Sequence, residues 1–421
     1  MSVSYNPSES VYWDPKALDR EFDRIFDLCH GCRLCFNLCP GFGELFKTID
    51  AHQELETAGL TQADDQRFVD LCYECKLCYP KCPYTPPHDW LIDIPRLVLR
   101  ARAIEARKHG VSRQDQFLGD TDRVGRIGTA VAPLANAMNR LPAARVAMEK
   151  MVGVHRDRLL PLFAVERFDQ WFRKAAGPDP ALLTNGKVVL FYTCSVNYHD
   201  TQVGQALTRV LWHNGIETRI EEQKCCGMPH LDGGNVEKTL EAARFNVERL
   251  LPWIERGYSV VTPGPTCSYM LRQEYPILLD NDAARTVAAN TFDACEYLMR
   301  LHRQKKLNTQ FRSNPGKVAY HQPCHLKAQN IGAQSRELLK LTGAEVTMID
   351  RCSGMDGTWG MKTEYFQLSL EVAGRLFQGI ERAEPDAVAT DCSLAAVQIR
   401  QGTPTQPRHP IEIVAEAYGL E

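Results

Sequence analysis

Two short segments of this chain are crowded with cysteine in the same spacing. Residues 29–40 are CHGCRLCFNLCP and residues 72–83 are CYECKLCYPKCP, so each segment ends on proline after four thiols. The 421-residue chain is far longer than a disulfide-stabilised secreted domain, and its first residues, MSVSYNPSESVYW, lack the basic and apolar parts of a secretory signal. Clustered thiols in a reducing compartment are expected to be metal ligands.

The spacing favours iron–sulfur clusters over zinc. The pattern C-x-x-C-x-x-C-x-x-x-C-P, present twice, is typical of two-cluster ferredoxins, in which the fourth cysteine of each run binds the other cluster. A structural zinc site usually takes its four thiolates from two separate C-x-x-C pairs, which fits this spacing poorly. We therefore predict two 4Fe–4S clusters. One is held by Cys29, Cys32, Cys35 and Cys82, and the other by Cys72, Cys75, Cys78 and Cys39.

The polypeptide around the two runs is predicted to be helical. Helices are expected at residues 15–28 and 90–108, and the segment 43–71 between the runs has apolar residues at helical spacing. We predict that residues 1–110 form a helical, two-cluster ferredoxin-like domain. Four polar residues inside the runs are expected to be solvated or to offset cluster charge: Arg33, Asn37, Lys76 and Lys81.

Charge and hydropathy exclude several classes of protein. The chain has 49 basic and 52 acidic residues, a net charge of −3, which argues against a nucleic-acid partner. No uncharged apolar run approaches the length of a membrane-spanning helix. A cytoplasmic protein is predicted, with peripheral attachment to the inner membrane face as an alternative. Residues 111–185, which contain no cysteine, are expected to be a helical connector or a membrane-surface amphipathic segment.

From residue 186 onward the chain is a duplicated pattern of strands and helices. KVVLFYTC corresponds to KVAYHQPC, TRIEEQKCCGM to VTMIDRCSGM, and YSVVTPGPTC to DAVATDC. Alternating strands and helices predict parallel sheets covered by helices. We expect a first repeat at residues 186–310 and a second at 311–421. The predicted fold class is thus multidomain, α+β and α/β, with a helical two-cluster ferredoxin domain before a duplicated parallel-sheet domain.

The cysteines of the repeats follow the ends of predicted strands. Parallel strands of one sheet end at the same edge, so these thiols are expected at a common rim, where ligands of such sheets bind. The first repeat supplies Cys194, Cys225, Cys226 and Cys267, and the second supplies Cys324, Cys352 and Cys392, with Ser353 in place of a paired cysteine. We predict a metal centre near the repeat interface. A third iron–sulfur cluster is the first choice; zinc, inert thiols or a redox-active thiol pair are the alternatives.

Other polar residues lie close to these cysteines in the sequence. His230, His321 and His325 are candidate ligands or proton carriers, or else hydrogen-bond to loop backbone. Asp391 and Lys362 are candidates for charge tuning. Cys295 has no counterpart in the other repeat and is predicted to be a core residue.

Several segments carry a family resemblance. GMPHLDGGN, HQPCHLK, CSGMDGTWGMKTEYFQLS and TDCSLAAVQI resemble the cysteine-rich CCG domains that occur in heterodisulfide reductase and in the iron–sulfur subunits of anaerobic glycerol-3-phosphate and glycolate dehydrogenases. The layout as a whole is similar to the iron–sulfur subunits of the glycerol-3-phosphate dehydrogenases. The opening residues 11–40 look closer to a heterodisulfide-reductase-related branch encoded beside a rubrerythrin-like protein.

The resemblance implies electron transfer between a redox partner and an acceptor. The implied partner is a flavoprotein dehydrogenase or a rubrerythrin-like protein, and the implied acceptor is a quinone or a disulfide. CCG cysteines of heterodisulfide reductase bind noncubane 4Fe–4S clusters, but Met270, Ser353 and Ala395 stand where this motif has further cysteines. The resemblance therefore favours an electron relay. A heterodisulfide-reductase-like catalyst and a zinc-stabilised scaffold are the alternatives.

Overall fold

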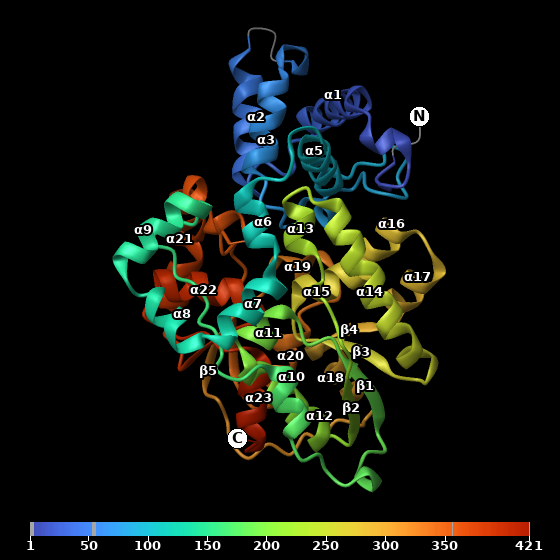
Figure 1. Cartoon of the computed structure of the whole chain (residues 1–421), viewed down its shortest axis with the longest axis vertical. Coiled ribbons are helices and arrows are strands. Elements are labelled where there is room, and N and C mark those ends of the chain that lie inside the picture. The colour runs from blue at the N-terminus through green and yellow to red at the C-terminus, as the bar shows by residue number, and fades with distance from the viewer. Residues whose placement is uncertain (1–3, 53–55, 356, 421) are drawn as a thin grey trace.

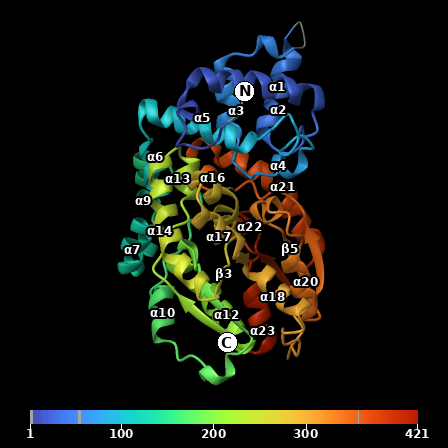
Figure 2. The ribbon, with the colours of Figure 1, turned by 90° about the vertical axis from the view of Figure 1, so that its right-hand side faces the viewer.

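The computed structural model describes residues 4–52, 56–355 and 357–420, and its architecture confirms the predicted multidomain fold class. A helical N-terminal part lies across one end of two α/β repeats (Figure 1). Viewed from the side, the first repeat, in green and yellow, and the second, in orange and red, stand next to each other beneath it (Figure 2). The N-terminal part therefore lies over both repeats at once.

The N-terminal part is built from α1 (Pro15–Cys32), α2 (Pro40–Ala51), α3 (Gln62–Leu71), the single turn α4 (Cys78–Lys81) and α5 (Ile94–His109). Asp14 and Asp93 begin α1 and α5, each accepting a hydrogen bond from a backbone N–H of the first turn. The apolar residues predicted between the runs are buried, among them Phe46, Ile49 and Phe68. Residues 53–55 of that predicted helical stretch lie outside the described residues.

Short helices connect the N-terminal part to the repeats: α6 (Arg113–Gly119), α7 (Thr121–Ala130), α8 (Ala132–Met138), α9 (Pro142–Val152) and α10 (Phe168–Lys174). They run along the outside of the repeats (Figure 1). Arg158, after α9, is buried and donates a hydrogen bond to the Oγ of Ser369 in the second repeat at 3.0 Å. The connector also carries five exposed apolar side chains spaced three or four residues apart, which we call the exposed apolar row: Ile127, Val131, Leu134, Met138 and Leu141.

The first repeat contains a parallel sheet in the order β2-β1-β3-β4, with β1 (Gly186–Leu190), β2 (Ile216–Ile220), β3 (Ser259–Thr262) and β4 (Thr291–Asp293). Its helices are α11 (Cys194–Tyr198), α12 (Thr201–His213), α13 (Met228–Asp232), α14 (Val236–Glu255), α15 (Pro265–Tyr269), α16 (Tyr275–Leu279), α17 (Asp282–Ala289) and α18 (Ala294–Arg303). A π-helical turn, Met270–Glu274, joins α15 to α16.

The second repeat contains a separate parallel sheet in the order β6-β5-β7, with β5 (Lys317–His321), β6 (Glu345–Ile349) and β7 (Ala387–Thr390). Its helices are α19 (Cys324–Ala328), α20 (Gln334–Leu341), α21 (Phe366–Ala383), α22 (Ser393–Gly402) and α23 (Pro410–Tyr418). In each repeat the second and third strands flank the first. The two sheets therefore share the same strand order over their first three strands, as the sequence duplication predicts.

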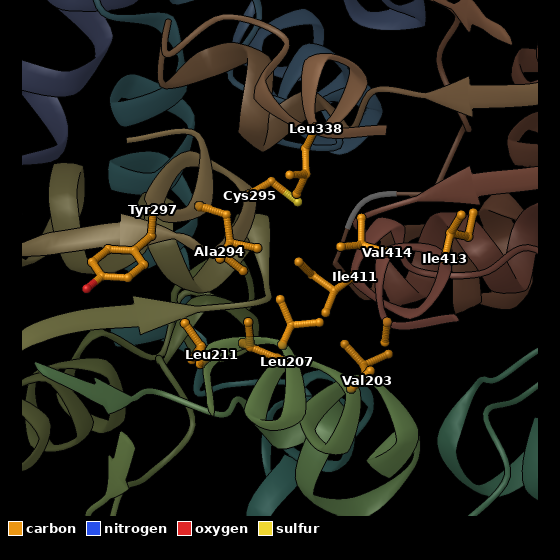
Figure 3. Close-up of a cluster of buried hydrophobic side chains, with 14 of the residues drawn as sticks. Val203, Leu207, Leu211, Ala294, Cys295, Tyr297, Leu338, Ile411, Ile413 and Val414 are labelled. Atoms are coloured by element: carbon orange, nitrogen blue, oxygen red, sulfur yellow. The ribbon is translucent and has the colours of Figure 1, made fainter. Parts of the chain in front are cut away.

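The two repeats are joined by a continuous hydrophobic core. Leu207 of α12 faces Ile411 of α23, and Leu211 of α12, Ala294 of α18 and Leu338 of α20 belong to the same cluster (Figure 3). Truncating one fully buried leucine of this kind to alanine costs about 2–5 kcal/mol of unfolding free energy. Among the described residues, no helix is long and apolar enough to cross a membrane.

Candidate metal centres

The first cysteine run gathers around the last turn of α1. Arg33, directly after Cys32, has a φ of 49° and turns the chain back on itself. Burial raises the pKa of the Cys29 thiol to about 12, and the neighbouring thiols of Cys35 and Cys82 contribute to this rise. A small cavity in this region is lined by Cys29, Cys32, Cys35 and Cys82 together with Phe42, Phe46 and Ile92. The last cysteine of the second run therefore lies among the first three of the first run.

The second run has the converse arrangement. Glu74 and Lys76, with φ of 56° and 62°, bend the loop that carries its first three thiols. Cys39, the residue before α2, lies beside them: burial raises its own pKa to about 11, and its thiol adds to the rise in the pKa of Cys72 and Cys78. The structure thus brings Cys39 of the first run to the three leading cysteines of the second.

Both groups suit iron–sulfur clusters in their chemistry and their spacing. Buried thiols that each raise the pKa of the next are costly to ionise without a metal, and metal ligation removes their protons and balances their charge. Sulfurs around one tetrahedral zinc ion lie about 3.8 Å apart, given a Zn–S distance of about 2.3 Å. Among the described residues, the one trio of metal-ligand atoms within 4.8 Å of one another contains none of these cysteines. The wider spacing fits a cluster better than one ion.

The four cysteines of the first repeat form a chain of contacts. Cys194 begins α11, Cys225 and Cys226 precede α13, and Cys267 lies in α15. Hydrogen bonds from Cys194 and Cys226 lower the pKa of Cys225 well below its usual value. The hydrogen bonds of Cys226 with Cys225 and Cys267, together with burial, raise the pKa of Cys226. The two thiols of the adjacent pair therefore differ in acidity, with Cys225 the more readily ionised.

Sequence reasoning missed a contribution from the connector to this group. Asp122, at the start of α7, accepts a hydrogen bond from the backbone N–H of Cys225 at 2.7 Å. Burial raises the pKa of Asp122 to about 6, and the Cys225 thiol contributes to that rise. The neighbouring Thr121 side chain contributes to the lowered pKa of Cys225. Neither residue lies in a recognisable metal motif, so nothing in the local sequence singles them out.

The cysteines of the second repeat do not join those of the first at one rim. Because the repeats have separate sheets, each has its own carboxyl edge. Cys324 hydrogen-bonds to Cys352 and also to Cys75 of the N-terminal part. Cys352 lies 3.4 Å from the hydroxyl of Tyr73. The expectation of a common rim is therefore wrong for this pair, which faces the second cysteine run instead. Cys392 precedes α22, where its N–H donates to the Oγ1 of Thr390 at 3.5 Å.

A buried polar junction joins the N-terminal part to both repeats. The Nε2 of His325 donates to the Glu74 carbonyl at 3.0 Å, and its Nδ1 accepts from the Thr266 hydroxyl at 2.9 Å. Burial lowers the pKa of His325 to about 4, and Lys76 contributes to this fall. Lys76 is 1 % exposed and forms an ion pair with Glu74, so the prediction of a solvated side chain is wrong for this residue. Arg33, in contrast, forms a part-exposed ion pair with Asp50.

The remaining candidate side chains have other partners. His321 hydrogen-bonds to the Thr390 hydroxyl at 2.9 Å, and burial lowers its pKa to about 4. Lys362 forms an ion pair with Asp115 at 2.7 Å. Burial lowers the pKa of His230, which lies near enough to Cys225 for the thiol to oppose that shift. Asp391 faces the buried Cys295 in the core.

The three residues that replace cysteines of the fuller motif are buried in the fold. Met270, Ser353 and Ala395 are 0 %, 4 % and 1 % exposed. Met270 begins the π-helical turn after α15, and the Ser353 hydroxyl donates to the Met355 carbonyl at 3.3 Å. These three positions are therefore filled by packed side chains, and they offer no thiolate to a metal.

A cavity of about 210 Å³ lies beside the second run. It is lined by Tyr73, Trp359, Tyr365, Asp232 and Lys362, among others. The ring of Tyr73 packs on that of Trp359, with 5.2 Å between the ring centroids. One wall of the cavity is therefore aromatic and belongs to both the N-terminal part and the second repeat.

Comparison with known proteins agrees with this organisation. The cysteine-rich domain family model, CCG, matches residues 188–272 and 318–400, and the citrate utilization protein B Fer4-like domain model matches residues 22–108. The C subunit of the anaerobic glycerol-3-phosphate dehydrogenase of Escherichia coli (strain K12) is 31 % identical over 335 residues, which cover 77 % of this chain and 82 % of that protein. Lactate utilization protein A of Geobacillus thermodenitrificans is 28 % identical over 245 residues, which cover 54 % of this chain and 98 % of that protein.

The predicted resemblance is therefore confirmed. The matches place a Fer4-like domain where the two cysteine runs lie and a cysteine-rich domain on each α/β repeat. This chain is an iron–sulfur protein that belongs to the family of the anaerobic glycerol-3-phosphate dehydrogenase C subunits.

Proposed function

We propose that this protein is the electron-transfer subunit of a dehydrogenase-type redox system. In this proposal one 4Fe–4S cluster is held by Cys29, Cys32, Cys35 and Cys82, and a second by Cys39, Cys72, Cys75 and Cys78. A third iron–sulfur centre is held by Cys194, Cys225, Cys226 and Cys267. Bound there, the clusters supply one-electron transfer, and the electrons come from a partner flavoprotein or rubrerythrin-like protein.

The observation that carries the proposal is the exchange of the fourth cysteine between the two runs. Cys82 lies among the thiols of the first run and Cys39 among those of the second. Burial and apolar walls hold these sulfurs away from water, and such desolvation is one of the levers that set cluster potentials. The chain lacks a G-x-G-x-x-G dinucleotide motif after a strand, so its two-electron donor is assigned to a partner.

The direct test is an anaerobic iron and acid-labile sulfide count with EPR. Roughly eight to twelve irons per chain are expected, whereas a zinc-stabilised scaffold would hold zinc and little iron. The variant Cys78→Ala should lose about four irons and one EPR signal and keep the signal of the first-repeat centre. Loss of every signal from a variant that still folds would contradict separate centres.

We assign the acceptor to the cavity beside the second run. Its wall includes Tyr73, which lies between two cysteines of that run, and the aromatic side chains of Trp359 and Tyr365, which stack at 4.6 Å between ring centroids. Aromatic rings on one wall of an otherwise polar cavity next to a redox centre suit a planar quinone with polar carbonyl oxygens. Trp359→Ala should raise the KM for a water-soluble quinone about tenfold and leave the iron content unchanged. An unchanged KM would remove the cavity from the acceptor route.

A second candidate function is disulfide reduction at the second repeat. The observation that favours it is the contact of Cys324 with both Cys352 and Cys75. As thiols, Cys324 and Cys352 would reduce a substrate disulfide by exchange, so that the two form a disulfide and the substrate leaves as two thiols. Two electrons relayed from the clusters and two protons from solvent would then restore the thiol pair. Cys324→Ser should abolish reduction of a small disulfide and spare quinone reduction if this candidate holds, and should leave disulfide turnover unchanged if it does not.

The exposed apolar row on the connector is assigned to docking of the redox partner. Ile127 and Leu134 are 59 % and 64 % exposed, and they belong to the same row as Val131, Met138 and Leu141. Single exposed apolar residues are common on protein surfaces, whereas a group of them marks an interaction site. Replacing Ile127 and Leu134 with glutamate should weaken capture of the flavoprotein partner and spare the EPR signals. Loss of binding to anionic lipid vesicles instead would assign the row to peripheral membrane attachment.

A further inference from the structure

A group of metal-ligand side chains outside the cysteine groups lies deep between the two repeats. Asp293 ends β4, Cys295 lies in the first turn of α18, and Asp391 follows β7. One ligand atom from each lies within 4.8 Å of the others, a compactness reached by no other such trio among the described residues. The three residues are 1 %, 0 % and 3 % exposed. Cys295 points toward α20 at the edge of the shared core (Figure 3).

The charges of this group are not balanced by a neighbouring side chain. Within the described part of the chain, neither carboxylate takes part in an ion pair, and the side chains whose charges act on Asp293 are Asp391 and Glu296, both acidic. Burying two carboxylates side by side is strongly unfavourable unless a proton or a cation compensates them. The donors at Asp391 are neutral: the Tyr320 hydroxyl at 2.7 Å and the Ser335 hydroxyl at 2.5 Å.

Helix capping explains the role of only one of the two carboxylate oxygens of Asp293. Its Oδ1 accepts from the backbone N–H of Cys295 at 3.0 Å, and Glu296 completes a reciprocal capping box at the start of α18. Asparagine or serine would cap equally well. The second oxygen, Oδ2, is buried and has no hydrogen-bond partner among the described residues. A buried carboxylate oxygen of this kind, beside a thiol and a second carboxylate, is suited to ligate a cation.

We propose that Asp293, Cys295 and Asp391 bind one divalent cation of the zinc type between the repeats. Calcium and magnesium take oxygen ligands, so a thiol among the three ligands selects a softer ion, and zinc accepts both sulfur and carboxylate oxygen. Binding releases the thiol proton of Cys295 to solvent. The Tyr320 and Ser335 hydroxyls orient Asp391 as outer hydrogen-bond donors do at metal sites.

The proposed ion would tie the two repeats together independently of any iron. Asp293 and Cys295 belong to the first repeat and Asp391 belongs to the second, so the same ion is bound by both. Asp391 directly precedes Cys392, and an ion here would fix the start of α22. The proposal does not depend on the assignment of the iron–sulfur centres.

The test is zinc analysis of the whole protein, purified anaerobically and dialysed against EDTA. About one zinc per chain is expected, and its X-ray absorption spectrum should show one sulfur with oxygen neighbours. Asp293→Asn should lower zinc occupancy about tenfold at unchanged iron content. Asp169→Asn is the matched control, because Asp169 is also a buried carboxylate but pairs with Arg167, and it should keep its zinc.

Two results would overturn the proposal. The first is a native protein with no metal other than iron, which would mean that a shared proton, and not a cation, compensates the two carboxylates. The second is a zinc whose neighbours are all sulfur and whose occupancy does not respond to Asp293→Asn. The X-ray absorption spectrum of the native protein tests the zinc site even if the variant does not fold. A protein that holds zinc but lacks iron would contradict the proposed function and leave this site unaffected.

Discussion

The hydroxyl of Tyr73 lies 3.4 Å from the Sγ of Cys352, although 279 residues separate the two in the chain. Tyr73 belongs to the second cysteine run and Cys352 to the second repeat. The same region contains the contact between Cys75 and Cys324. The second run is therefore the part of the N-terminal domain that meets the cysteines of a repeat.

Tyr73→Phe tests whether this contact tunes the redox properties of the region. Removing the hydroxyl takes a hydrogen-bonding partner from Cys352, which contacts Cys75 of the second-run cluster through Cys324. We expect a shift on the order of tens of millivolts in the midpoint potential of that cluster, because hydrogen bonds around cluster sulfurs set potentials. Anaerobic EPR-monitored redox titration measures it. Tyr79→Phe is the control, because the Tyr79 ring faces Arg96. Equal shifts in both variants would contradict a specific role for Tyr73.

The exchanged cysteines predict which signal each variant loses. Cys39→Ser should remove the cluster held mainly by the second run, and Cys82→Ser should remove the one held mainly by the first. Each variant should lose about four irons. The two spectra should therefore be complementary, with Cys78→Ala matching Cys39→Ser and Cys35→Ala matching Cys82→Ser. The opposite pairing would mean that each run binds its own cluster.

Asp122→Asn tests the contribution of the connector to the first-repeat centre. The Asp122 carboxylate holds the backbone of Cys225 at 2.7 Å, and an amide oxygen makes a weaker, uncharged hydrogen bond there. We expect an altered spectrum or a several-fold faster loss of metal to a chelator from this centre alone. Asp157→Asn, an exposed acid of the same connector, should behave like the native protein. If both variants keep the native release rate, Asp122 is only a packing residue.

Asp232 should make stability depend on pH. Burial raises its pKa to about 7, against the opposing effect of Lys76. Between its ordinary pKa near 4 and about 7, the folded chain keeps a proton that the unfolded chain has lost, so stability falls as pH rises through that window and then levels off. Asp232→Asn should remove this slope and stabilise the protein at pH 8 by on the order of 1–2 kcal/mol.

Anaerobic denaturant unfolding between about pH 5 and pH 8 measures the Asp232 effect. Asp282→Asn, which changes a fully exposed aspartate, is the control and should keep the native slope. If the free energy of unfolding of Asp232→Asn depends on pH as in the native protein, groups other than Asp232 cause that dependence.

The sequence by itself determined the local chemistry and the periodic structure. The cysteine spacing of the two runs, the alternation of strands and helices, and the repeat of both are patterns within a few dozen residues. Such patterns fix which side chains share a loop or a helix face because backbone geometry relates near neighbours. The N-terminal helices, the two parallel sheets and the cysteines that follow β1, β3 and β5 result from them.

Only the tertiary structure decided which distant groups meet. The two sheets stay separate, so the cysteines of the repeats divide into a group beside Asp122 and a pair beside Cys75. Lys76 is buried because two domains close over it, although its sequence neighbours predict a solvated loop. Asp293 and Asp391 approach each other through the packing of the two repeats against one core. Burial and long-range contact depend on the summed packing of many side chains, which no local pattern encodes.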